Sequence, residues 1–209
     1  MKTILFILLS VFFNNDDFKL QTGDLIFQES CKGNSDNTIK EVTSSIEGYR
    51  FTHVGMVYID DRDSIYVIEA THPKVAVTPL NEYLYPQDKN CYPTSVVGRL
   101  KQEYQKYIPQ AIQEGLKLVG KDYDYGYVLN NDKYYCSELI YDILLKANNN
   151  QPVFELNTMT FKSPETGEFT QGWIDYFQKL NMAIPEGEPG INPGAMSRSD
   201  VIDILYRYR

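Results

Sequence analysis

Residues 51 to 73 contain the feature that most restricts the fold: two β-rich runs that flank the short polar segment "DDRDS". β-Branched and aromatic residues are frequent in both runs, so the segment predicts an antiparallel hairpin. If the connection is the three-residue loop from Asp61 to Asp63, position 53 pairs with position 71. His53 and Glu69 then lie on one face as diagonal neighbours, whereas a two- or four-residue loop places them on opposite faces.

Glu69 lies in the otherwise apolar run "YVIEA", and a carboxylate that faces a core needs a polar partner. With the three-residue loop, Glu69 can hold the imidazole of His53 in one tautomer and one orientation. The alternative is that both residues are structural, His53 at a strand end and Glu69 in an ordinary hydrogen bond. The chain has one other histidine, His72, which precedes a proline just after the second run.

Cys136 precedes an amphipathic segment within the stretch "KYYCSELIYDILLKANNN", residues 133 to 150. Apolar residues recur there at helical spacing and predict a helix with one buried face: Leu139, Ile140, Ile143, Leu144 and Ala147. Cys136 falls within the first turn, where unpaired N–H groups and the helix dipole favour a thiolate. The alternative is that Cys136 is a small buried apolar residue.

The remaining segments complete an α+β pattern. We expect strands at residues 23 to 28 and 95 to 100, a further strand at "AVTPL", and a loop or short helix between residues 29 and 47. Helices are expected at residues 109 to 119, ended by Gly120, and around "GWIDYFQKL". Asp24, in a "GD" turn, is interpreted as structural. The tail after residue 150 is expected to wrap around a small antiparallel sheet that is packed by helices.

The amino terminus resembles an export signal. Lys2 is followed by an apolar run from Ile4 to Phe13 and then by polar residues, and this run is too short to span a bilayer as a helix. We therefore expect residues 1–15 to be an export signal and residues 16–209 to form one domain. A buried amino-terminal strand is the alternative.

The three cysteines are an odd number, so an exported chain leaves one of them unpaired or pairs it with another chain. We hypothesise a disulfide between Cys31 and Cys91, which leaves Cys136 as the free thiol. A metal site is not expected, because the sequence has neither paired cysteine spacing nor two histidines on one helical face. No cofactor is expected either.

The formal net charge of −8 over 209 residues argues against partners that bind through basic patches. Nucleic acid and anionic lipid both require such patches, and the sequence has no run of lysine or arginine.

Several motifs, taken in order, resemble the YiiX/YebB-like permuted papain-like amidases, a branch of the NlpC/P60 superfamily. The resemblance runs from Gln21 to Ala147, and the tail "IPEGEPGINPGAMSRSD" is similar as well. The motifs are "QTGDLIFQ", "THVGMVY", "YVIEA", "VTPLNEYL", "VGKDYDYGY" and "YYCSELIYDI". The resemblance implies a circularly permuted papain-like fold. It also implies that Cys136 is the nucleophile, His53 the general base and acid, and Glu69 the residue that orients His53.

The expected function is that of an exported cysteine amidase or peptidase, periplasmic or extracellular in a bacterium, without a stable membrane span after signal removal. It would hydrolyse a small peptide, such as one of cell-wall type, or an acyl amide through a thioester. The Cys136 backbone N–H would stabilise the oxyanion, with Gln28 or Tyr135 as candidate second donors. The alternatives are an acyltransferase or lipid-acyl hydrolase with the same triad, or a binding module without turnover. The oligomeric state is left open.

Overall fold

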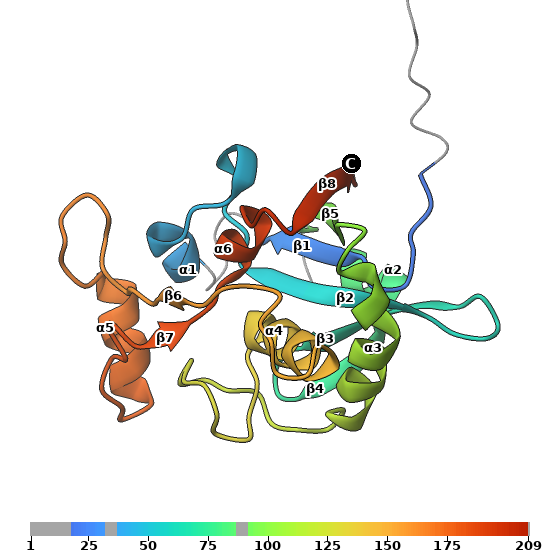
Figure 1. The fold of residues 1–209 in the computed structure, drawn as a ribbon. Coiled ribbons are helices and arrows are strands. Elements are labelled where there is room, and N and C mark those ends of the chain that lie inside the picture. The colour runs from blue at the N-terminus through green and yellow to red at the C-terminus, as the bar shows by residue number, and fades with distance from the viewer. Residues whose placement is uncertain (1–17, 32–36, 87–91, 209) are drawn as a thin grey trace, which may run out of the picture.

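The structure is a computed structural model, and it describes residues 18–31, 37–86 and 92–208 (Figure 1). The expected export signal, residues 1–15, lies outside these ranges. Within them, no helix has the length and apolar character that crossing a membrane requires.

The central element is an antiparallel sheet, which confirms the expected α+β class. Its six strands within the described residues follow the order β4-β3-β2-β1-β5-β8. The strands are β1 (Leu25–Glu29), β2 (His53–Ile59), β3 (Ile65–Ala70), β4 (Val75–Pro79), β5 (Thr94–Leu100) and β8 (Ile202–Arg207).

The hairpin of β2 and β3 has the register that the three-residue loop predicts. Met56 pairs with Ile68, and the N–H of Asp60 donates to the carbonyl of Ser64 at 3.0 Å. The Asp60 carboxylate also accepts hydrogen bonds from the backbone N–H groups of Arg62 and Ser64, both at 2.9 Å. These local bonds fix the turn, and with it the face on which each strand residue lies.

Helices α3 (Ile108–Lys117) and α4 (Cys136–Ala147) lie side by side across one face of the sheet (Figure 1). The predicted apolar stripe of α4 is buried against this face, with Leu139, Ile140 and Ile143 fully inaccessible. Gly120 adopts a φ of +91°, shortly after α3 ends. This left-handed conformation suits glycine, but α3 ends at Lys117 and not at residue 119, so Gly120 lies in the turn that follows the helix.

The smaller elements surround this core. α5 (Gln171–Lys179) is the helix expected around "GWIDYFQKL", and α1 (Asn37–Val42) lies in the segment expected to be a loop or short helix. The structure adds α2 (Leu80–Leu84), α6 (Pro193–Ser197), the short pair β6 (Asn157–Thr158) and β7 (Pro189–Gly190), and 3₁₀ turns at Ile46–Gly48 and Gln105–Tyr107. In Figure 1, α5, β6 and β7 project to the left of the sheet.

The carboxyl-terminal tail does more than wrap around the sheet. Its last strand, β8, pairs with β5 and becomes an edge of the sheet, which the sequence interpretation missed. Before that strand, the tail forms an apolar cluster of its own, in which Met159, Phe161, Trp173 and Phe177 are buried. The tail therefore completes the fold at two places.

Cys136 is a buried free thiol, as expected. Cys31 is disulfide-bonded. Its expected partner, Cys91, lies outside the described residues, so the pairing of Cys31 with Cys91 stays a prediction.

Candidate active site

His53 and Glu69 meet across the hairpin. Nε2 of His53, at the start of β2, lies 2.6 Å from Oε2 of Glu69 in β3. The other carboxylate oxygen of Glu69 accepts a hydrogen bond from the hydroxyl of Thr78 at 2.5 Å. Glu69 is buried, so both oxygens find partners inside the protein, as a buried carboxylate requires.

Cys136 is the first residue of α4, and the residue before it, Tyr135, still has extended backbone geometry. Sγ of Cys136 lies 4.0 Å from the carbonyl oxygen of Thr52, the neighbour of His53 in the chain. The thiol of Cys136 also lies close enough to the imidazole of His53 to raise the pKa of His53. Because Nε2 faces Glu69, Nδ1 is the ring nitrogen that remains for the thiol. The structure thus places the imidazole between a thiol and a carboxylate.

The charge state of His53 follows from these neighbours. Burial lowers the pKa of His53, but hydrogen bonds to Cys136 and Glu69 and attraction to both side chains outweigh it and raise the pKa to about 10. His53 therefore carries a proton at neutral pH. An imidazolium beside a cysteine stabilises the thiolate, which is the reactive form of that residue.

Two hollows meet at this site. A polar hollow of about 460 Å³ is lined by His53, Glu69, Thr78 and Glu82, among others, and a small hollow of about 40 Å³ borders Cys136. Four described residues line both: Ile39, Thr52, Tyr123 and Tyr127. Among the described residues that line the small hollow, none is charged. The reacting atoms thus lie between a polar and an uncharged compartment.

The two candidates for a second oxyanion donor are both engaged within the protein. Nε2 of Gln28 donates to the carbonyl of Tyr83 at 2.9 Å and to Oγ of Ser95 at 3.2 Å. The hydroxyl oxygen of Tyr135 accepts a hydrogen bond from the N–H of Ile191 at 3.3 Å. Gln28 lines the polar hollow and Tyr135 the small one. A role for either in binding the oxyanion stays a prediction.

Sequence reasoning missed two residues that support the pair of His53 and Glu69. Thr78 is a diagonal neighbour of Glu69, since Glu69 pairs with Ala76 in β4. The register of β4 would have been the signal, but sequence alone does not provide it. The ring of Tyr83 packs against His53 with centroids 5.7 Å apart, and its hydroxyl donates to the carbonyl of Ile26 at 2.8 Å.

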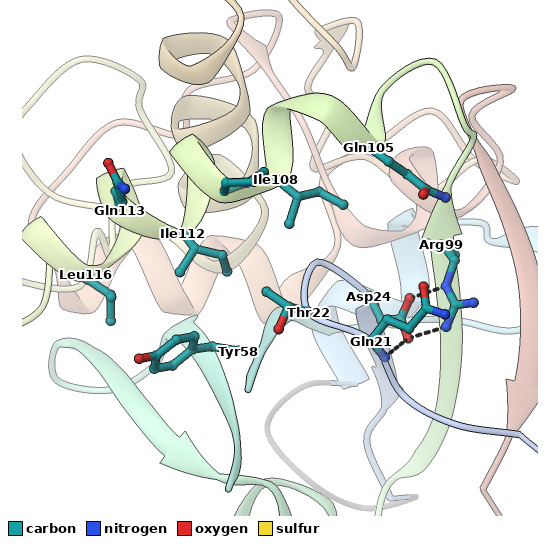
Figure 2. Close-up of a pocket in the computed structure, with 11 residues that line it drawn as sticks. Gln21, Thr22, Asp24, Tyr58, Arg99, Gln105, Ile108, Ile112, Gln113 and Leu116 are labelled. Atoms are coloured by element: carbon teal, nitrogen blue, oxygen red, sulfur yellow. Dashed lines mark hydrogen bonds and ion pairs between the residues drawn. The ribbon is translucent and has the colours of Figure 1, made fainter. Parts of the chain in front are cut away.

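A third hollow, of about 550 Å³, shares none of its described lining residues with those two (Figure 2). Figure 2 shows Arg99 and Asp24 pointing toward each other at one end of it. Asp24 accepts two hydrogen bonds from Arg99, at 2.6 and 2.8 Å, and one from the N–H of Gln21 at 2.8 Å. Because all these groups are satisfied, Asp24 has the structural role that was expected of it.

A metal ion bound by side chains needs several ligand residues close together. Among the described residues, no three His, Cys, Asp or Glu side chains come together as metal ligands. At the active site, His53 and Glu69 are hydrogen-bonded to each other.

Comparison with known proteins gives three findings. Residues 19–206 match the family described as "permuted papain-like amidase enzyme, YaeF/YiiX, C92 family". Over 128 residues, 61% of this chain, the sequence is 33% identical to the uncharacterized protein YiiX of Escherichia coli (strain K12), and the match spans 58% of that relative. The fold is similar to the crystal structure of metalloprotein yiiX from Escherichia coli O157:H7, with a TM-score of 0.72 and 22% identity over 91% of this chain and 99% of that one.

Proposed function

Because the chain belongs to the permuted papain-like amidase family YaeF/YiiX, C92, we propose that it hydrolyses an amide bond through a thioester on Cys136. The observation that carries this proposal is the position of the His53 imidazole, between the thiol of Cys136 and the carboxylate of Glu69. In this order the three side chains serve as nucleophile, general base and acid, and orienting residue.

Cys136, His53 and a water molecule are sufficient for both steps of the proposed hydrolysis. The thiolate of Cys136 attacks the acyl carbon, and the C–N bond breaks as the His53 imidazolium gives its proton to the leaving amine. Neutral His53 then takes a proton from water, and the resulting hydroxide attacks the thioester. The C–S bond breaks, and the carboxylic acid leaves. The Cys136 backbone N–H, in the first turn of α4, supports the oxyanion in both steps.

The two hollows suggest how a substrate lies. The uncharged hollow beside Cys136 fits a small apolar group of the acyl part, and the polar hollow beyond His53 fits the amine part. A space of about 40 Å³ accommodates a short side chain better than a long lipid chain. We therefore extend the proposal to small peptides or short acyl amides, such as those of cell walls, in preference to lipid substrates.

We further propose that the protein acts after export, because residues 1–15 have the charge and apolar pattern of an export signal. Fractionation of the native host checks this part. A protein found only in the cytoplasm with residues 1–15 retained would refute export and leave the chemistry untouched.

The enzymatic proposal is tested by amine release from a library of short peptides and acyl amides, with matched thioesters and lipid esters as comparison substrates. Cys136→Ala and His53→Ala are expected to abolish release, and Glu69→Gln to reduce it strongly. Mass spectrometry of the quenched enzyme should show an acyl adduct on Cys136. Turnover that survives Cys136→Ala would overturn the proposal, and turnover of lipid esters alone would move it to acyl-lipid chemistry.

A further inference from the structure

The two residues on either side of the nucleophile contact the same residue of the distant tail. The hydroxyl of Ser137 donates to the carbonyl of Ile191 at 2.8 Å, and the N–H of Ile191 donates to the hydroxyl oxygen of Tyr135 at 3.3 Å. Cys136 lies between these two residues at the start of α4. The backbone of Ile191 thus bridges the peptide segment that carries Sγ.

The bridge is buried. Ser137 is inaccessible, and the exposed fractions of Ile191 and Tyr135 are 1% and 2%. Hydrogen bonds in such an environment have no water to replace them, so removing one partner leaves the other unsatisfied. The tail also packs closely against Tyr135, because a Cβ on Gly190 would lie 3.1 Å from the Tyr135 hydroxyl.

The tail that provides Ile191 is itself anchored. Asn192 caps α6, with its side-chain oxygen accepting from the N–H of Ala195 at 2.8 Å. Ser197, at the end of α6, donates to the carbonyl of Gly194 at 2.7 Å and accepts from the N–H of Ile46 at 3.1 Å. Ile191 is therefore a fixed point against which the start of α4 can be held.

The first turn of a helix needs such support. Its N–H groups have no partners within the helix, and helix ends fray. A displacement of about 1 Å at a reacting atom can reduce a rate about 100-fold. Ile191 and Ser137 also line the small hollow together with Cys136, so the bridge adjoins the space proposed for the acyl group.

We infer that Ser137 and Tyr135 are positioning residues, which act through the backbone of Ile191 to hold the thiol of Cys136 in reach of His53. The segment of residues 189–197 is accordingly a part of the nucleophile's support. This inference rests on the proposed function, because it concerns the reactivity of the same thiol.

The test compares two buried serines in the full-length chain. Ser137→Ala removes the bond to Ile191, whereas Ser197→Ala removes bonds of the same tail that do not contact α4. The readout is the rate of Cys136 alkylation by iodoacetamide at pH 6.5, followed at each cysteine by mass spectrometry. We expect about a tenfold lower rate in Ser137→Ala and a near wild-type rate in Ser197→Ala, because only Ser137 joins the first turn of α4 to Ile191.

Two further variants keep the test decisive. Tyr135→Phe removes the other half of the bridge and should also slow alkylation, which provides an answer if Ser137→Ala does not fold. Ser137→Thr retains the hydroxyl, so we expect its Cys136 alkylation rate to be close to that of the wild type and well above that of Ser137→Ala. A general loss of stability would not produce this difference between the two variants.

The outcomes separate the two proposals. Wild-type rates in folded Ser137→Ala and Tyr135→Phe, with a fast wild-type reaction that depends on His53, would overturn the positioning role alone. An equal loss in Ser197→Ala would overturn it too, since the effect would then be general destabilisation. If Cys136 of the wild type reacts no faster than in the unfolded chain, the proposed function fails, and the positioning role fails with it.

Discussion

Thr78 and Glu69 form a hydrogen bond of 2.5 Å that joins the active site to the outermost strand on that side of the sheet. The hydroxyl of Thr78 holds one oxygen of the carboxylate, and the other oxygen lies 2.6 Å from His53. Glu69 is therefore fixed from β4 as well as from its own strand. This arrangement predicts that the orientation of the imidazole depends on Thr78, whose hydroxyl bonds to the carboxylate of Glu69.

The variant Thr78→Val tests this dependence, because valine keeps the shape and removes the hydroxyl. A hydrogen bond to a charged group contributes about 1.5–3 kcal/mol, and we expect part of this to appear as a roughly tenfold lower turnover. Thr22→Val is the control, since it removes a bond to the N–H of Ile59 outside the site. Equal turnover of wild type and Thr78→Val would contradict the prediction.

The raised pKa of His53 predicts how its contribution to stability depends on pH. The folded-state pKa of about 10 exceeds the ordinary value of 6.5. Protonated His53 therefore stabilises the folded state fully below about pH 6.5, and this stabilisation disappears as the pH rises toward 10. The difference in unfolding free energy between wild type and His53→Gln, measured with denaturant, should shrink from pH 6 to pH 10. His72→Gln is the control, and a difference that grows with pH would refute the assignment.

Glu138, two residues after the nucleophile, should lose stabilisation with rising pH as His53 does, but over a lower pH range. Burial and the nearby Asp124 and Asp142 raise its pKa to about 8, although the backbone N–H groups of Tyr135 and Asn130 bond to it and lower the pKa. The folded state thus holds a proton that the unfolded chain releases above about pH 4.5. Between these values, wild type should lose stability relative to Glu138→Gln by up to about 1.4 kcal/mol per pH unit.

Denaturant titrations of both proteins between pH 5 and 9 measure this slope. Glu114→Gln provides a control, because a hydrogen bond from Lys117 lowers the pKa of Glu114 and leaves it ionised throughout this range. If the difference in unfolding free energy between wild type and Glu138→Gln does not change with pH, the folded protein does not retain this proton.

A substitution of Gln28 tests whether this residue is the second oxyanion donor. Its amide already donates to Tyr83 and Ser95, so we expect Gln28→Leu to lower the unfolding free energy by about 1–3 kcal/mol and turnover by less than tenfold. Loss of an oxyanion donor would instead reduce turnover about 100- to 1,000-fold. A drop of that size in a folded variant would identify Gln28 as the donor.

The pair of His53 and Glu69 could be predicted because its geometry is local. Alternation within two strands and the length of one turn fix which side chains share a face, and the loop between Asp60 and Ser64 has the predicted form. Thr78 could not be assigned in the same way. Its place beside Glu69 depends on the pairing of β3 with β4, in which Glu69 faces Ala76, and the sequence does not specify that register.

Local sequence patterns were enough to predict the hairpin, the helix near Cys136 and the shared face of His53 and Glu69, because nearby residues govern periodicity, turns and helix starts. Three other features became known from the three-dimensional fold: Cys136 lies beside His53, Ile191 bridges Tyr135 and Ser137, and β8 completes the sheet. These contacts join segments far apart in the chain. They form because the whole core buries its apolar faces together, and no local pattern encodes that packing.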